Sequence, residues 1–200
     1  MSRARRSMGN MRIRMWVLAY VIACAQMMVS SAGAADPRFL TLSTDFPAPS
    51  GASNLCRTYA WACAATLGQR FGAAREYELV QRVNQQVNAA TRDVADRRQY
   101  NLEEKWALPT RLGGDCEDFA LLKKRDLIRI GLDPRKLLLA TVLDRKRNAH
   151  AVLVYRSAQG DMVLDNLTNR IRPWQATGYI FLRMQDPRRP HNWVGVQNKA

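Results

Sequence analysis

The 200-residue sequence has little glycine, proline and histidine, with 11 Gly, 8 Pro and 2 His. So few glycines and prolines exclude a collagen-like or low-complexity chain, and the ordinary share of apolar residues argues against disorder. Acidic residues are also scarce, because 17 Asp and Glu stand against 31 Lys and Arg and leave a net charge of +14. The length and composition predict one globular domain with a hydrophobic core.

The first 35 residues have the pattern of a secretory signal peptide. Five arginines precede the uncharged segment 15–30, and the small residues 32–35 follow it. This segment is shorter than the roughly 20 apolar residues that a membrane-spanning helix needs. We therefore expect residues 1–35 to be cleaved, leaving a protein that is not integral to a membrane. The alternatives are an uncleaved anchor and lipoprotein anchoring at Cys24, but residues 25–29 stay apolar where a mature lipoprotein usually turns polar.

The positive charge does not predict a nucleic-acid partner. Removing residues 1–35 takes away five Arg and no acid, which leaves 26 basic against 17 acidic residues and a net charge of +9. An exported protein meets little nucleic acid, and the basic clusters at 123–125, 145–147 and 188–189 contain no interleaved aromatic residues. We interpret these clusters as solvated surface, with an acidic partner or an anionic membrane surface as the alternative.

Hydrophobic periodicity divides the remaining chain into helices followed by strands. We expect an extended lead-in at 36–52, one folded domain at 53–186 and a flexible basic tail at 187–200. The predicted helices are 53–67, 73–91 and 115–130, and the predicted strands are 137–143, 149–155, 162–167 and 179–184. Helices that precede an antiparallel sheet indicate an α+β fold.

Three cysteines remain after residue 35. Cys56 and Cys63 lie seven residues apart within the predicted helix 53–67, which would hold their Cα atoms roughly 10 Å apart. That distance is too long for a disulfide, so we expect both to be small buried core residues. The third cysteine, Cys116, is then an unpaired thiol in an oxidising compartment.

Cys116 follows two glycines and Asp115 at the start of the predicted helix 115–130. The free N–H groups and the dipole of a helix N-terminus favour a thiolate and can stabilise an oxyanion on a substrate carbonyl. Asp115, Glu117 and Asp118 act in the opposite direction, because nearby negative charge raises the pKa of a thiol. A protonated histidine or a bound cation would offset them. A structural cysteine is the alternative interpretation.

His150 and Asp165 supply the other parts of a catalytic triad. His150 begins one predicted strand, and Asp165 lies among apolar residues of the next. A buried carboxylate needs a partner, so adjacent strands would let Asp165 bond one imidazole nitrogen while the other serves as a base toward Cys116. The alternatives are a packed structural histidine and a turn that begins at Asp165.

Four segments resemble the bacterial transglutaminase-like cysteine proteinases, whose best-studied type is the LapG-like periplasmic protease. They are 106–109, 113–120, 150–155 and 164–167. The resemblance implies a papain-like transglutaminase core, in which the nucleophile lies at a helix N-terminus packed on an antiparallel sheet. It also implies a catalytic triad of Cys116, His150 and Asp165, and a periplasmic location.

The resemblance further implies dependence on Ca²⁺, with Asp115 and Glu117 as ligands and Asp118 as a third. Carboxylate oxygens suit this hard cation, which would remove their repulsion of a thiolate. The alternative is helix capping by Asp115 and favourable acids in the first helical turn.

The sequence thus predicts a periplasmic, calcium-dependent cysteine endopeptidase. By the same resemblance its substrate is a surface or exported protein such as a large biofilm adhesin, and its regulator is an inner-membrane receptor. Two alternatives stay open. A transglutaminase would pass the acyl group to an amine, and a non-catalytic periplasmic module would bind calcium or protein without turnover.

Overall fold

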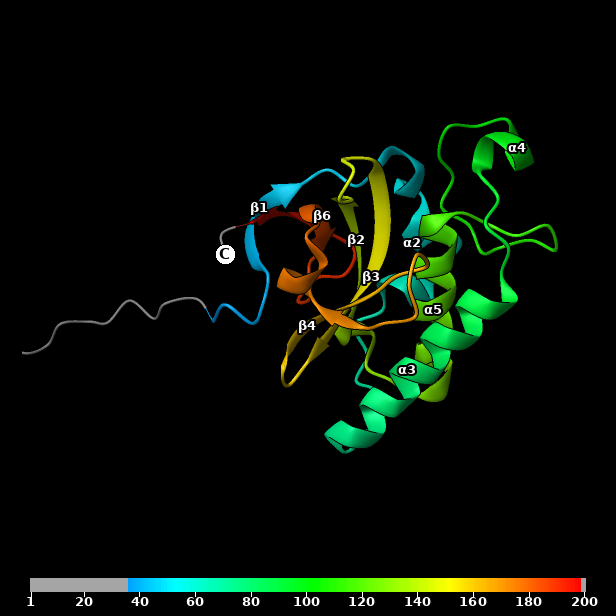
Figure 1. Cartoon of the computed structure of the whole chain (residues 1–200). Coiled ribbons are helices and arrows are strands. Elements are labelled where there is room, and N and C mark those ends of the chain that lie inside the picture. The colour runs from blue at the N-terminus through cyan, green and yellow to red at the C-terminus, as the bar shows by residue number, and fades with distance from the viewer. Residues whose placement is uncertain (1–35, 199–200) are drawn as a thin grey trace, which may run out of the picture. The chain divides into compact units, whose positions relative to one another are not determined.

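The computed structural model describes residues 36–198 (Figure 1), so the predicted signal peptide and Cys24 lie outside the described residues. The helices are α2 (Leu55–Thr58), α3 (Ala73–Ala90), α4 (Asp96–Tyr100) and α5 (Cys116–Ile130), and short 3₁₀ segments occur before, between and after them. The strands are β1 (Thr41–Phe46), β2 (Leu137–Leu143), β3 (Ala149–Ser157), β4 (Gly160–Leu164), β5 (Arg172–Pro173), β6 (Ile180–Gln185) and β7 (Trp193–Gln197). No helix within 36–198 is both long and apolar enough to cross a membrane.

The strands form one antiparallel sheet in the order β1-β7-β6-β2-β3-β4-β5. The central strands β2 and β3 pair from Leu137 opposite Tyr155 to Leu143 opposite Ala149. These strands are nearly continuous apolar runs because each face of the sheet contributes to a separate hydrophobic cluster. The α+β class that the sequence predicts is therefore confirmed.

Helices α3 and α5 lie side by side, and α5 packs against β3 (Figure 1). Val80, Val83 and Val87 of α3 are buried at spacings of three and four, as the predicted amphipathic stripe requires. Helix α5 ends at Gly131, whose φ of 105° is the left-handed geometry of a helix C-cap. The predictions of helices at 73–91 and 115–130 are confirmed to within one residue at each end.

The prediction of a helix at 53–67 is wrong. Helix α2 ends at Thr58, Tyr59 has a non-helical φ of −131° and ψ of 77°, and a separate 3₁₀ turn covers Ala60–Cys63. This break brings the Cα atoms of Cys56 and Cys63 to 5.4 Å, and the two residues form a disulfide. The expectation of two unpaired cysteines failed because it assumed the rise of a continuous helix, whereas Cys116 is the free cysteine of the described residues.

The predicted flexible tail and the predicted domain limits also need correction. Residues 193–197 form β7, which lies between β1 and β6 in the sheet. The lead-in contributes β1, whose Phe46 pairs with Trp193. The domain therefore extends beyond 53–186 at both ends, because two short strands far apart in the sequence complete one edge of the sheet.

Candidate active site

Two glycines shape the loop that leads into α5. Gly113 has a φ of +131°, which favours glycine over residues with a side chain. The backbone N–H of Gly114 donates to the carbonyl of Arg92 at 3.0 Å. A Cβ at Gly114 would lie 2.5 Å from a carboxylate oxygen of Asp118, so no larger residue fits there without a shift. This close passage places Cys116 at the first position of α5.

The sulfur of Cys116 makes two hydrogen bonds. The backbone N–H of Ala151 donates to Sγ at 3.3 Å, and the thiol donates to Oε2 of Glu117 at 3.2 Å. Burial raises the pKa of the Cys116 thiol, and the negative charge of Glu117 raises it further. In this arrangement the thiol hydrogen is directed at the carboxyl group of Glu117 and not at His150.

His150 and Asp165 form a buried pair. Nε2 of His150 lies 2.9 Å from Oδ1 of Asp165, and the residues are 8% and 3% exposed. Burial favours the neutral form of Asp165, but hydrogen bonds from His150 and Tyr179 outweigh it and hold its pKa below the ordinary range. An ionised Asp165 can only accept, so Nε2 of His150 carries a hydrogen, and in the neutral tautomer the lone pair is then on Nδ1.

Tyr179 completes this pair and was missed by sequence reasoning. Its hydroxyl donates to Oδ2 of Asp165 at 2.6 Å, and its ring packs edge-on against the His150 ring with centroids 5.8 Å apart. It precedes β6 and lies 14 residues beyond Asp165. A tyrosine beside an apolar strand has no signal that distinguishes it from an ordinary core residue.

Helix α3 anchors the loop that carries Asp165. Strand β4 ends at Leu164, so Asp165 lies just past the strand and accepts the N–H of Leu167 at 3.0 Å. The side-chain amide of Asn88 donates to the Asp165 carbonyl at 2.9 Å and to the Thr168 carbonyl at 3.3 Å. The predicted adjacency of the two strands is confirmed because β3 pairs with β4, but Asp165 itself lies one residue beyond β4, in a turn that α3 holds.

Cys116 and His150 line the same cleft, which has a volume of about 410 Å³. The other lining residues are Glu103, Glu104, Asp115, Glu117, Thr141, Val142, Ala149, Ala151 and Leu182. The structure therefore brings the three predicted catalytic residues together, because His150 joins the cleft of Cys116 to the buried carboxylate of Asp165.

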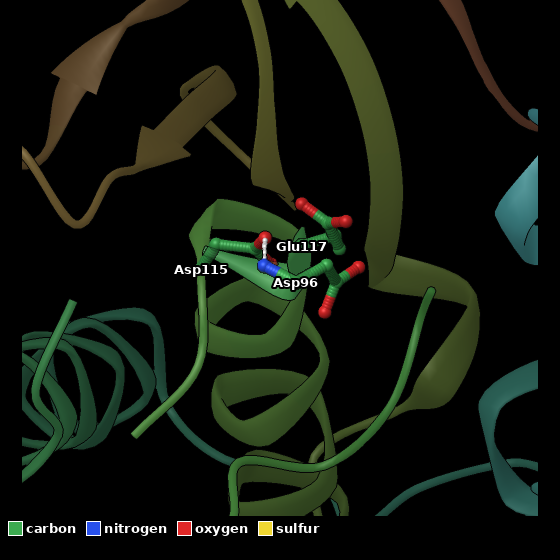
Figure 2. Close-up of side chains that lie close together, drawn as sticks. All are labelled: Asp96, Asp115 and Glu117. Carbon is green, nitrogen blue, oxygen red and sulfur yellow. Dashed lines mark hydrogen bonds between the residues drawn. The ribbon is translucent and has the colours of Figure 1, made fainter. Parts of the chain in front are cut away.

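A cluster of three acids lies beside the thiol (Figure 2). One carboxylate oxygen from each of Asp96, Asp115 and Glu117 lies within 4.8 Å of the others. Asp96 comes from α4, and its backbone N–H donates to Oδ2 of Asp115 at 3.1 Å, the dashed line in Figure 2. Within residues 36–198, no lysine or arginine forms a salt bridge with these carboxylates.

This cluster is electrostatically unfavourable without a cation. Burial, followed by the charge of Asp115, raises the pKa of Glu117 to about 8 and also raises the pKa of Asp96. Oδ1 of Asp96 and Oδ1 of Asp115 are buried with no hydrogen-bond partner among the described residues. Three neighbouring carboxylates, two of which have a buried oxygen without a partner, offer the oxygen ligands that Ca²⁺ prefers.

Asp118 does not belong to this cluster. Its Oδ1 accepts the N–H of Ala107 at 2.9 Å, and burial raises its pKa to about 7. The sequence prediction placed Asp118 as the third ligand because it is close in sequence to Asp115 and Glu117. In the structure Asp96 takes that position, from a polar segment whose composition gave no sign of a site.

A family model described as bacterial transglutaminase-like cysteine proteinase BTLCP matches residues 43–200. No curated protein matches the sequence. Among solved structures, calcium-bound LapG of Legionella pneumophila is 24% identical with a TM-score of 0.47, and the alignment covers 54% of this chain and 64% of that one. EGTA-treated LapG of the same organism has the same identity and TM-score, with 62% of its length covered. The chain thus spans less than two thirds of each of these structures.

Proposed function

The chain belongs to the bacterial transglutaminase-like cysteine proteinases, and we propose that it is an endopeptidase whose triad is Cys116, His150 and Asp165. The α+β domain is the papain-like transglutaminase core of this family. One observation carries the proposal. His150 is held by Asp165 through Nε2 at 2.9 Å, and both His150 and Cys116 line the same cleft.

Each side chain of the triad has a distinct role in peptide hydrolysis. Nδ1 of His150 takes the thiol proton, and the sulfur of Cys116 attacks the carbonyl carbon of the scissile bond. The backbone N–H of Cys116, at the N-terminus of α5, stabilises the resulting oxyanion. The imidazolium then gives its proton to the departing amine as the C–N bond breaks. Water hydrolyses the thioester, with His150 again acting as the base, while Asp165 holds the ring and stabilises its charged form.

We propose that Asp96, Asp115 and Glu117 hold Ca²⁺ beside this triad. The residues fit the ion, since they are oxygen donors and two of their buried oxygens have no partner among the described residues. When bound, the ion would supply positive charge that offsets the repulsion between these acids and a Cys116 thiolate. The side chain of Asp115 makes no helix-capping hydrogen bond and instead accepts the N–H of Asp96, so the alternative role of Asp115 as a helix cap is not supported.

The location and the substrate belong to the same proposal. The arginine-rich and then apolar pattern of residues 1–35 supports export, and the disulfide of Cys56 and Cys63 suits an oxidising compartment such as the periplasm. A protein substrate follows from the family. Cleavage of a surface adhesin and control by an inner-membrane receptor are supported by the family resemblance alone.

The test is the rate at which iodoacetamide alkylates Cys116 at neutral pH, followed by mass spectrometry. We expect fast alkylation in the wild type with calcium, and much slower alkylation in the His150→Ala variant. His191→Ala is the matched control, because His191 is the other histidine and is exposed. Equal and slow alkylation in all three proteins would contradict the triad and favour a non-catalytic binding module.

Acyl transfer is tested separately with p-nitrophenyl acetate. The proposal expects acetylation of Cys116 that water slowly reverses, and no acetylation in Cys116→Ala. A primary amine added to the same reaction distinguishes the two acceptors. An acetylated amine as the main product would identify a transglutaminase and contradict the proposed hydrolysis.

A further inference from the structure

A second pocket of about 180 Å³ lies beside Asp165 and shares none of its lining residues with the cleft at Cys116. Its polar lining consists of three arginines and three hydroxyl residues in addition to Asp165. They are Arg145, Arg170, Arg172, Thr168, Thr177 and Tyr179. Three guanidinium groups at one small pocket repel one another, so their presence there calls for a ligand of opposite charge.

The protein supplies one carboxylate against the three arginines of this pocket. Asp165 is the one carboxylate in the lining, and its oxygens already accept hydrogen bonds from His150, Tyr179 and the N–H of Leu167. Within residues 36–198, none of the three arginines forms a salt bridge. By contrast, Arg156, which lies outside this pocket, forms a salt bridge with Asp161 across a short hairpin.

Backbone contacts hold parts of the pocket in place before any ligand arrives. Nε of Arg145 donates to the Thr177 carbonyl at 2.8 Å, which fixes that guanidinium from the loop between β2 and β3. Arg172 is half-buried on β5, where it pairs with Val163 of β4. Oγ1 of Thr168 accepts the N–H of Arg170 at 3.2 Å, which leaves its hydroxyl hydrogen free to donate. Donors held in this way lose little freedom on binding.

We propose that this pocket binds an oxyanion group, either a phosphate or a carboxylate. Planar guanidinium groups bond such oxyanions in pairs, and the hydroxyl of Thr168 supplies a further donor. The group is carried by a free small molecule or by an acidic side chain of a polypeptide. The inference rests on the arginines and their missing partners, and it stands whether or not Cys116 acts as a nucleophile.

The test is an NMR titration of the full chain with inorganic phosphate, at an ionic strength kept constant with NaCl. Constant ionic strength removes the general screening of surface charge. We expect amide shifts confined to residues 167–172 and 177–179. The Arg170→Gln/Arg172→Gln double variant should bind phosphate at least about tenfold more weakly. Lys146→Gln is the matched control, because Lys146 is an exposed cation next to Arg145 and outside the lining, and it should bind as the wild type does.

A parallel titration with N-acetylglutamate amide distinguishes the two sources. Shifts at 167–179 with phosphate alone identify a free oxyanion, and shifts with both probes identify a site that also takes an acidic side chain. The absence of localised shifts with either probe would overturn the proposal, as would equal phosphate binding by the double variant. Should the double variant not fold, Arg170→Gln at an exposed side chain provides the same comparison.

Discussion

Replacing Asp96 by asparagine should make the protein more stable without calcium and less responsive to it. The asparagine side chain has nearly the same shape, and its oxygen can still accept the N–H of Lys105 that Asp96 accepts. The substitution removes one of three acids whose oxygens lie within 4.8 Å of one another. It therefore relieves repulsion in the metal-free protein and removes a charged ligand from the calcium-bound one.

The size of the effect follows from Coulomb's law. Two unit charges at this separation repel by about 3 kcal/mol at an effective dielectric constant near 20. Burial and the charge of Asp115 raise the pKa of Asp96, in the direction that this repulsion requires. Because the effective dielectric constant beside a solvent-filled cleft can be higher, the relief is about 1–3 kcal/mol. A domain of this size gains about 2–4 °C in Tm for each kcal/mol. In EGTA the variant should therefore melt about 2–12 °C above the wild type.

Calcium should reverse this order. A ligand stabilises the folded state in proportion to the logarithm of its concentration over Kd. The wild type has three carboxylates and should bind calcium with the lower Kd, so calcium should raise its Tm more than that of the variant. Scanning fluorimetry of both proteins in EGTA and in calcium measures the two differences. Asp93→Asn is the matched control, since Asp93 is an exposed acid on the same segment and should change neither value. A variant that melts below the wild type in EGTA would refute the idea that these acids repel.

Three further predictions concern groups outside the acid cluster. Tyr179→Phe removes a hydrogen bond to the charged Asp165, a contact of about 1.5–3 kcal/mol, and should slow alkylation of Cys116 about tenfold. Cys56→Ser should lower the free energy of unfolding by about 2–3 kcal/mol in urea titrations, and a reductant should lower the wild type to the same level. Lys123 and Lys124 are buried, so the interpretation of 123–125 as solvated surface is wrong for these two residues. Burial lowers the pKa of Lys124 from 10.5 to about 7, so between these values the folded chain binds fewer protons than the unfolded chain and stability rises with pH. Lys124→Met should flatten that rise and be the more stable protein at pH 7, as urea titrations at pH 7 and pH 9 would show.

The parts of the fold that the sequence predicts well are those set by local periodicity. Helix α3 has its apolar residues three and four apart, and α5 lies between a glycine pair and Gly131, so both were located to within one residue. The central strands were equally clear, because runs such as 149–155 are too apolar and too short for anything but a buried strand. In each case the pattern lies within the element itself.

The parts that the sequence did not predict depend on distant partners. The segment 53–67 has the composition of a helix, but the disulfide and the turn at Tyr59 override that preference. Strand β7 looked like a tail because its five residues become a strand only between β1 and β6. Asp96 joins Asp115 only because the loop from Arg92 pairs with Gly114, a contact between distant positions of the chain.

Two residues beside the first turn of α5, Glu117 and His150, compete for the hydrogen of the Cys116 thiol. Cys116 needs an acceptor for its proton, and both Glu117 and His150 lie in its cleft. Oε2 of Glu117 accepts the hydrogen bond of the thiol at 3.2 Å, while the bond from His150 to Asp165 keeps the imidazole oriented. The hydrogen bond between His150 and Asp165 is therefore already formed, whereas the thiol hydrogen is bonded to Glu117. Under the proposed triad, a cation bound by Glu117 would compete with the thiol for this carboxyl group, whereas the helix dipole and the N–H of Ala151 favour the thiolate with or without the cation.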